Sequence, residues 1–198
     1  MKKLLVIAAA ILSFGAANAQ IAAYLGYQSV TTKAKVGDVT TSEPYSGFLV
    51  GGAMNFDVYE GIGIQPALEL NYYGKTKNQT TLSSFGAKIP IDVNYGFDLA
   101  PDFKLYAFAG PSIYIGILNK TKYDSYDPVA DKTTKVTRDN YENNLKRFGL
   151  GFGLGAWCDF KDMIRLKVAY DMGLNDRSQN SNVKFKENTF SISVGYLF

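Results

Sequence analysis

The stretch from Asn188 to Phe198, NTFSISVGYLF, decides the fold. Apolar residues alternate here with small or polar ones, and the apolar set is Phe190, Ile192, Val194, Tyr196 and Phe198. Because successive side chains of a strand point to opposite faces, this alternation predicts a strand with one apolar face. The stretch stops on an aromatic residue, whereas chain ends are usually polar and frayed. We therefore expect this strand to lie in an apolar environment.

The same period-two alternation recurs in seven other segments, each bounded by turn residues. They lie at residues 20–33, 45–59, 61–74, 82–97, 103–118, 145–160 and 163–174. Short connections at 60–61, 98–102 and 161–162 alternate with long polar segments at 34–44, 75–81, 119–144 and 175–187. This alternation of short and long connections predicts an antiparallel up-and-down array of strands. Both chain termini should then lie on the side of the short turns.

The apolar faces of these strands are predicted to contact lipid. The strands exceed the roughly 9–11 residues that a tilted membrane strand needs, whereas strands of soluble proteins usually have about 5–6. Aromatic residues gather near both ends of the apolar faces, as in the two girdles of a membrane barrel. The polar face of one strand carries four glycines that suit a crowded interior: Gly149, Gly151, Gly153 and Gly155. Periodicity alone also permits a soluble lipocalin-like barrel, in which the apolar faces point inward.

A sheet that spans a bilayer must leave no open edge, because lipid offers no hydrogen-bond partners. The first and last strands should therefore pair and close an all-β, eight-stranded, antiparallel up-and-down transmembrane β-barrel. Pro66, Pro90 and Pro111 lie inside predicted strands, and each removes a backbone donor. We expect a bulge or a local bend at some of these prolines.

The first residues predict export. Two lysines precede a short apolar run over residues 4–14, and a small-residue site follows at 17–19. This is the pattern of a cleaved secretory signal peptide over residues 1–19, and it leaves a single barrel domain over 20–198. The signal peptide contains two of the 21 basic residues and none of the 18 acidic ones, so the domain has a net charge of +1. That balance gives no reason to expect nucleic acid as a partner.

With an export signal, eight alternating strands and the aromatic end VGYLF, the chain resembles the small outer-membrane β-barrel family that includes the OmpA transmembrane domain and OmpX. The MKKLL start and the Tyr- and Gly-rich body are similar to "porin family" barrels of Bacteroidetes-type bacteria. The resemblance implies a location in the Gram-negative outer membrane. It also implies that the barrel assembly machinery reads the last strand through Phe190, Ile192, Val194, Tyr196 and Phe198.

Charged residues lie on the predicted inner faces of the strands: Glu69, Lys88, Asp92, Arg147, Arg165, Lys167 and Asp171. Glu69 and Lys88 lie at similar heights on neighbouring strands, which predicts an ion pair. The interior of an eight-stranded barrel is just wide enough for side chains, and buried charges must be paired. We therefore interpret these residues as a polar network that plugs the lumen. The alternative is a narrow porin-like channel for small ions or solutes.

We expect no catalytic residue, cofactor or metal site. The sequence contains no His, so a His-dependent dyad or triad is impossible, and the single Cys158 is interpreted as a small hydrophobe. The segment 119–144 is either a contact surface for a ligand or partner, or a solvated hairpin. The sequence thus predicts a monomeric, non-enzymatic outer-membrane barrel for envelope integrity and surface contact. Its expected partners are outer-membrane lipids and the barrel assembly machinery.

Overall fold

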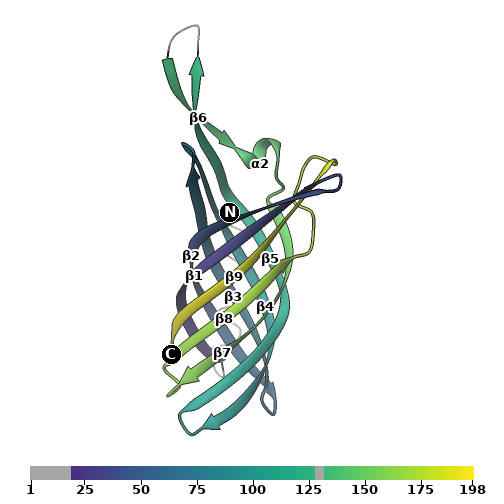
Figure 1. Cartoon of the computed structure of the whole chain (residues 1–198). Coiled ribbons are helices and arrows are strands. Elements are labelled where there is room, and N and C mark those ends of the chain that lie inside the picture. The colour runs from purple at the N-terminus through teal and green to yellow at the C-terminus, as the bar shows by residue number, and fades with distance from the viewer. Residues whose placement is uncertain (1–18, 128–131) are drawn as a thin grey trace, which may run out of the picture.

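The computed structural model describes residues 19–127 and 132–198, so residues 1–18 of the predicted signal peptide lie outside the described residues. Eight antiparallel strands form a closed ring (Figure 1). They are β1 (Ala19–Val36), β2 (Val39–Tyr59), β3 (Ile62–Lys77), β4 (Thr80–Ala100), β5 (Phe103–Asp127), β7 (Phe148–Phe160), β8 (Ile164–Gly173) and β9 (Val183–Leu197). β1 pairs with β9 from Ala22 opposite Leu197 to Val36 opposite Val183. The predicted eight-stranded up-and-down barrel is therefore confirmed.

The strands run further at the long-segment end than the sequence predicted. Segments 34–44 and 75–81 are not loops, because β1 continues into β2 and β3 into β4 as paired hairpins. Gly37, Asn78 and Gln79 in their turns have positive φ angles, as two-residue hairpin turns require. The prediction failed here because the outer faces of these extensions carry Lys, Ser and Thr in place of apolar residues, so the period-two signal disappears while the backbone hydrogen bonds continue.

A further hairpin stands above the ring. β6 (Lys132–Asp139) pairs along its length with the outer part of β5 and rises above the barrel in Figure 1. A single helical turn, α2 (Asn140–Asn143), follows, and the Asp139 carboxylate caps it by accepting a hydrogen bond from the Tyr141 N–H. Within the described ranges, no helix is long and apolar enough to cross a bilayer. The backbone of segment 119–144 therefore forms the predicted hairpin where the structure describes it. A role of this segment in contacting a ligand or partner stays a prediction.

The prolines do not shift the strand register. The β3–β4 pairs keep one register on either side of Pro66 and Pro90, and the β4–β5 pairs do so across Pro111. The irregularities lie elsewhere, between Asp57 and Tyr59, between Phe85 and Gly86, and between Asp98 and Ala100. The expected bulges are therefore absent at the prolines, whereas the alternative of a local bend stays a prediction. Each proline removes only one donor, and the pairs on both sides of it hold the strand in place.

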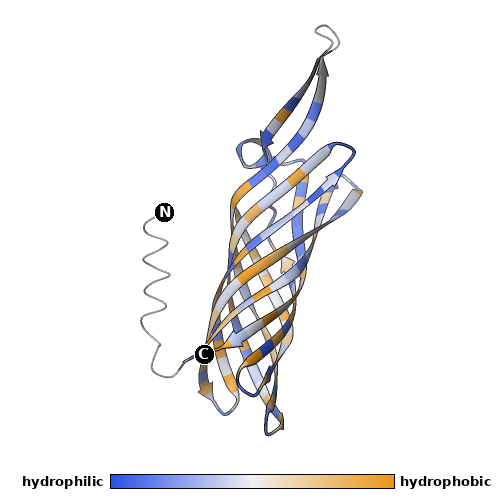
Figure 2. Cartoon of the chain, turned by 90° about the vertical axis from the view of Figure 1, so that its left-hand side faces the viewer, coloured by the Kyte–Doolittle hydropathy of each residue, from blue (hydrophilic) through white to orange (hydrophobic). Residues whose placement is uncertain are grey.

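Apolar side chains cover the outside of the barrel and polar ones line its inside. On β9 the side chains of Phe190, Ile192 and Val194 are 41–49% exposed, whereas Ser191 and Ser193 are buried. Figure 2 shows apolar segments along the barrel wall and mainly hydrophilic colours on the hairpin above it. A soluble lipocalin-like barrel needs the apolar faces inside, so that alternative is wrong.

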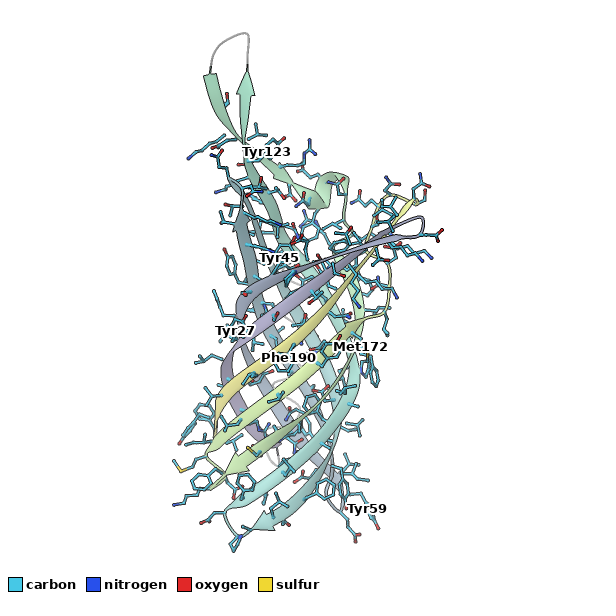
Figure 3. All side chains as sticks on the ribbon, viewed as in Figure 1. Tyr27, Tyr45, Tyr59, Tyr123, Met172 and Phe190 are labelled. Atoms are coloured by element: carbon cyan, nitrogen blue, oxygen red, sulfur yellow. The ribbon has the colours of Figure 1, made fainter. Side chains whose placement is uncertain are left out.

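Aromatic residues form a belt near each end of the apolar wall. In Figure 3, Tyr27 and Phe190 lie at similar heights, well above Tyr59 at the short-turn end. The lower belt includes the T-shaped pair of Tyr196 and Phe198, whose ring centroids lie 5.0 Å apart. Amphipathic aromatic rings favour the two interfaces of a bilayer, so the belts mark the two edges of an apolar wall that fits a membrane.

Candidate functional site in the barrel lumen

The centre of the lumen holds a cluster of three charged side chains, one lysine between two carboxylates. Lys88 Nζ lies 2.8 Å from Glu69 Oε2 and 2.7 Å from Asp171 Oδ2. Glu69 and Lys88 are direct ladder partners on β3 and β4, whereas Asp171 reaches across the lumen from β8. Tyr24 donates its hydroxyl proton to Glu69 Oε1 at 2.9 Å. The predicted contact between Glu69 and Lys88 is present, and a third charged residue joins it.

Lys167 lies on the short-turn side of this cluster and has both ionic and aromatic partners. Its Nζ lies 3.4 Å from Asp92 Oδ2. It also lies 4.6 Å from the ring centre of Phe108 and 5.7 Å from that of Tyr24. A cation within about 6 Å of an aromatic face is attracted by the ring quadrupole, and the attraction grows when water is excluded. The ammonium group is therefore compensated on several sides.

An aromatic layer beside Lys167 fills the half of the lumen near the short turns. Trp157 is 1% exposed, and its ring stacks 5.1 Å from Tyr106 and lies 5.1 Å from Phe108. The guanidinium of Arg165 lies 4.6 Å from the Trp157 ring centre and donates two hydrogen bonds of 2.7 Å to the Asp159 carboxylate. Bidentate pairs of this kind are the strong form of the ion pair.

The glycines of β7 make room for these side chains. A Cβ atom on Gly155 would collide with the carbonyl oxygen of Val168 and lie 2.7 Å from the Phe108 ring. A Cβ on Gly151 would lie 2.6 Å from Ser112 Oγ, and one on Gly153 would lie 2.9 Å from Asp171 Oδ1. The glycine stripe therefore permits an interior that is closely packed.

The other half of the lumen is less completely filled. A cavity of about 60 Å³ separates Lys88 and Asp171 from a second polar layer. In that layer Arg177 pairs with Glu187, and Tyr73 donates its hydroxyl proton to Glu187 Oε1 at 2.6 Å. Beyond this layer a second cavity, of about 360 Å³, opens at the long-segment end. The lumen is thus interrupted by side chains at more than one level.

Residues 4–198 match the family model described as the outer membrane protein β-barrel domain. The chain belongs to this family. It is an outer-membrane β-barrel protein of the Gram-negative envelope, as the resemblance implied. In such barrels the short turns face the periplasm and the long segments face the cell exterior. The cavity of about 360 Å³ is therefore the extracellular mouth of the barrel.

Solved structures similar to this outer-membrane barrel share its fold but little of its sequence. Ail, the attachment invasion locus protein of Yersinia pestis, in complex with the heparin analogue sucrose octasulfate, is 14% identical, with 91% of this chain and 99% of that chain covered and a TM-score of 0.49. Neisserial surface protein A is 18% identical, with 89% and 99% covered and a TM-score of 0.47. The outer membrane enzyme PagL is 11% identical, with 85% and 97% covered and a TM-score of 0.49. No curated protein matches the chain.

One predicted lumen residue of the barrel is elsewhere. Arg147 is exposed on the extracellular side, donates a hydrogen bond of 2.8 Å to the carbonyl oxygen of Ile117 and packs on the Tyr141 ring. Its assignment to the lumen is wrong because β7 begins only at Phe148, so the inward alternation does not reach it. The other six charged residues of the prediction, Glu69, Lys88, Asp92, Arg165, Lys167 and Asp171, line the interior.

Arg177 is a buried charge of the barrel that sequence reasoning missed. It comes from the polar segment between β8 and β9, which has no periodicity that would assign it to a face. Its guanidinium packs 4.5 Å from the Tyr114 ring centre and pairs with Glu187. Among the described residues, no group of three or more His, Cys, Asp or Glu side chains is arranged to hold a metal ion.

Proposed function

We propose that this protein is a closed, monomeric, non-enzymatic barrel that supports envelope integrity and presents its extracellular segments for surface contact. The observation that carries the proposal is the filled periplasmic half of the lumen. Trp157, Phe108 and Tyr106 form one layer there, and Lys167 lies against it. An ion would have to displace both the rings and the paired charges to pass, so the resting barrel does not conduct.

Conductance across a planar bilayer tests the closed lumen. The wild-type barrel should give no stable current above background. The double variant Phe108→Ala/Trp157→Ala should show brief openings, because it removes two rings of the layer and leaves the paired charges as the barrier. Phe152→Ala/Leu154→Ala, which removes side chains of similar size from the outer face of β7, is the matched control and should stay closed. A stable open current from the wild-type protein would overturn the proposal, whatever the variants do.

A narrow channel is the second candidate, and the two cavities in the extracellular half support it. Their volumes are about 60 and 360 Å³, and both cavities lie on the path from the exterior to Lys88. The channel would then need the Arg177–Glu187 layer, the paired charges around Lys88 and the Trp157 layer to move. Currents that switch between two levels under applied voltage would favour this candidate over a permanently closed barrel.

The non-enzymatic role rests on the absence of His from the sequence and on the pairing of the central lumen carboxylates with cations. A general base must be free to take a proton, whereas Glu69 and Asp171 are both bonded to Lys88. Incubating the purified barrel with outer-membrane lipids should leave their masses unchanged. New lipid or peptide fragments that appear only with the folded protein would contradict this part of the proposal.

The outer face of β9 is the proposed contact for the barrel assembly machinery. Its apolar residues Phe190, Ile192, Val194, Tyr196 and Phe198 are all exposed on the wall. Replacing Phe198 with Ser should lower the amount of folded barrel in the outer membrane without changing the stability of the purified protein. Replacing Leu197, which points inward and is 3% exposed, with Ser is the comparison that should lower stability instead.

A further inference from the structure

Four lysines face one another on the outer surface of β1 and β9. Lys33 is the direct ladder partner of Lys186, and Lys35 is the partner of Lys184. All four side chains are exposed. They continue the face of Tyr27 and Phe190, because they lie an even number of residues from them along the same strands. We call these four residues the lysine quartet.

The lysine quartet is unfavourable for the isolated protein. Directly opposite residues of an antiparallel pair have Cβ atoms about 4.5–5.5 Å apart, and like charges at such positions are destabilising. The second row lies about 7 Å further along the strands. The Cβ atoms of the four lysines therefore lie on a patch of about 5 by 7 Å, so their flexible side chains can bring the four ammonium groups to one or two anions.

No carboxylate in the part of the chain that the structure describes forms an ion pair with the quartet. On the adjoining β2, Ser42 is the ladder partner of Lys33 and Thr40 is the partner of Lys35. Asp176, from the segment beside β9, accepts hydrogen bonds from the N–H groups of Phe185 and Ser178. The charge of Lys184 also contributes to the lowered pKa of Asp176, but the two groups form no ion pair.

The overall charge distribution agrees with an anionic partner outside the cell. The extracellular segments at 33–43, 75–81, 119–147 and 174–187 contain fourteen Lys or Arg and nine Asp or Glu. The periplasmic segments at 57–61, 98–104 and 159–165 contain three and six. The basic excess is therefore confined to the side of the outer leaflet.

The height of the quartet identifies the kind of partner. Above Tyr27 on the outer face of β1 come Ser29 and Thr31, which are polar, and then the lysines. Six residues of a strand tilted by about 40° rise roughly 15 Å, so Lys33 lies above the aromatic belt in the headgroup layer. In Figure 1 the ends of β1 and β9 run side by side at the edge of the barrel. Thr32 and Phe185 of these ends face the mouth, so the lysines beside them lie on the opposite, outer face.

We propose that the lysine quartet binds the phosphate groups of a phosphorylated glycolipid in the outer leaflet. Phosphate oxygens accept charge-assisted hydrogen bonds from ammonium groups, and two phosphates would remove the repulsion between the lysine rows. The lipid is favoured over a soluble anion because the quartet is continuous with the lipid-facing wall and points sideways into the headgroups. This inference rests on the location in the outer membrane and does not depend on whether the lumen is closed.

The test compares binding of lipopolysaccharide, as the phosphorylated glycolipid probe, to the full barrel in neutral detergent. The variant Lys33→Gln/Lys35→Gln/Lys184→Gln/Lys186→Gln should bind it at least tenfold more weakly than the wild type. The matched control replaces four other exposed lysines of the extracellular side, Lys77, Lys120, Lys122 and Lys135, with Gln. It has the same net charge and should lose less than twofold.

Two further arms separate the possible sources of phosphate. Dephosphorylated lipopolysaccharide should bind no better to the wild type than to the quartet variant. Inorganic phosphate at millimolar concentration should not displace the intact glycolipid. Equal losses for the quartet and control variants would overturn the proposal, because net charge alone would then explain binding. Displacement by inorganic phosphate would overturn the assignment to a lipid.

Thermal unfolding gives an independent test, because the difference in unfolding temperature between the quartet variant and the wild type should depend on whether the glycolipid is present. Without glycolipid, the quartet variant should unfold at the same temperature as the wild type or a higher one, because like-charge repulsion is gone. With glycolipid, the wild type should unfold at the higher temperature. A quartet variant that is less stable than the wild type in neutral detergent alone would show that the lysines stabilise the fold and would contradict the proposal.

Discussion

Lysines serve opposite purposes inside the barrel and on its outer wall. Lys88 is almost enclosed and contacts two carboxylates, at 2.7 and 2.8 Å. Lys33 and Lys186 are exposed, and each has another lysine as its direct ladder partner. A charge in the lumen must be neutralised by the chain itself, because little water reaches it. A charge in the headgroup layer is left for the surroundings to neutralise.

The comparison separates what holds the barrel together from what attaches it to its surroundings. Removing an interior lysine should damage the fold in any solvent. Removing an exterior lysine should lower stability only when an anionic lipid is present.

The largest effect is expected for Lys88→Met, which leaves Glu69 and Asp171 without their cation. Breaking a buried ion pair from one side costs about 3–5 kcal/mol. Urea unfolding in detergent should show a loss of this size. Lys77→Met, at an exposed position, should stay within about 0.5 kcal/mol of the wild type. An equal stability of the Lys88 variant and the wild type would mean that the ion pair does not hold the lumen.

Gly155→Ala tests the close packing of the lumen against the looser lipid face. The added methyl group would meet the Phe108 ring and the Val168 carbonyl, and overpacking costs typically about 1–3 kcal/mol. Gly52→Ala is the control, because a Cβ there would have only the Ala22 carbonyl oxygen nearby, at 3.6 Å. The same unfolding measurement should show a loss for Gly155 alone. Equal effects at the two positions would argue against a filled lumen.

A local effect is expected for the extracellular segment between β8 and β9. Burial raises the pKa of Asp176, but hydrogen bonds from the N–H groups of Phe185 and Ser178 outweigh it, so the pKa lies below its usual value. A lowered pKa stabilises the folded segment above the unfolded-state value of about 3.9 and loses this effect as the pH falls through the folded pKa. Protection of the Phe185 amide against hydrogen exchange should therefore be constant from about pH 5 to 7 and fall in stronger acid.

Asp176→Ala should remove this dependence on pH. Its Phe185 amide should exchange at the rate of an unprotected amide throughout the range, while the strands of the barrel wall keep their protection. Protection that survives the substitution would show that the loop is held by other contacts.

The smallest effect is expected at the exposed pair of Glu43 and Lys75. Their 2.9 Å contact is exposed at both side chains, and the hydrogen bond and charge of Lys75 lower the pKa of Glu43. Surface ion pairs contribute little because water and salt screen them. Glu43→Gln should leave the unfolding temperature unchanged within error at 0.15 M salt. A clear loss would mean that charges at the mouth behave like those of the lumen.

The sequence predicted the part of the barrel where lipid constrains the side chains. Between Tyr27 and the ends of β1 and β2, the surroundings of the outer face change from lipid to water, and the alternation of apolar and polar residues ends. Along the membrane wall, the outward side of Phe190 and Ile192 must be apolar, so the period is visible. Above the wall both faces meet water, and the continuation of β1 into β2 leaves no hydrophobic trace, although every backbone pair continues.

The lumen could be predicted only as far as strand alternation reaches. Strand alternation assigned Glu69 and Lys88 correctly to the lumen, because both residues lie within regular strands. It misplaced Arg147, which lies just before β7, and it missed Arg177, which enters the lumen from an irregular segment. Side chains from irregular segments obey no period, so their burial depends on tertiary packing that a single sequence does not display.

The closed ring has a consequence for proteolysis at the cell surface. Every strand of the ring is hydrogen-bonded to a neighbour on each side, including β1 and β9, the first and last strands that the structure describes, which pair with each other. A cut in the turn at Asn78 and Gln79 would therefore leave β3 held by β2 and β4, and β4 held by β5. A nicked barrel should stay in the membrane as one folded unit, and its two fragments should separate only when heat opens the ring.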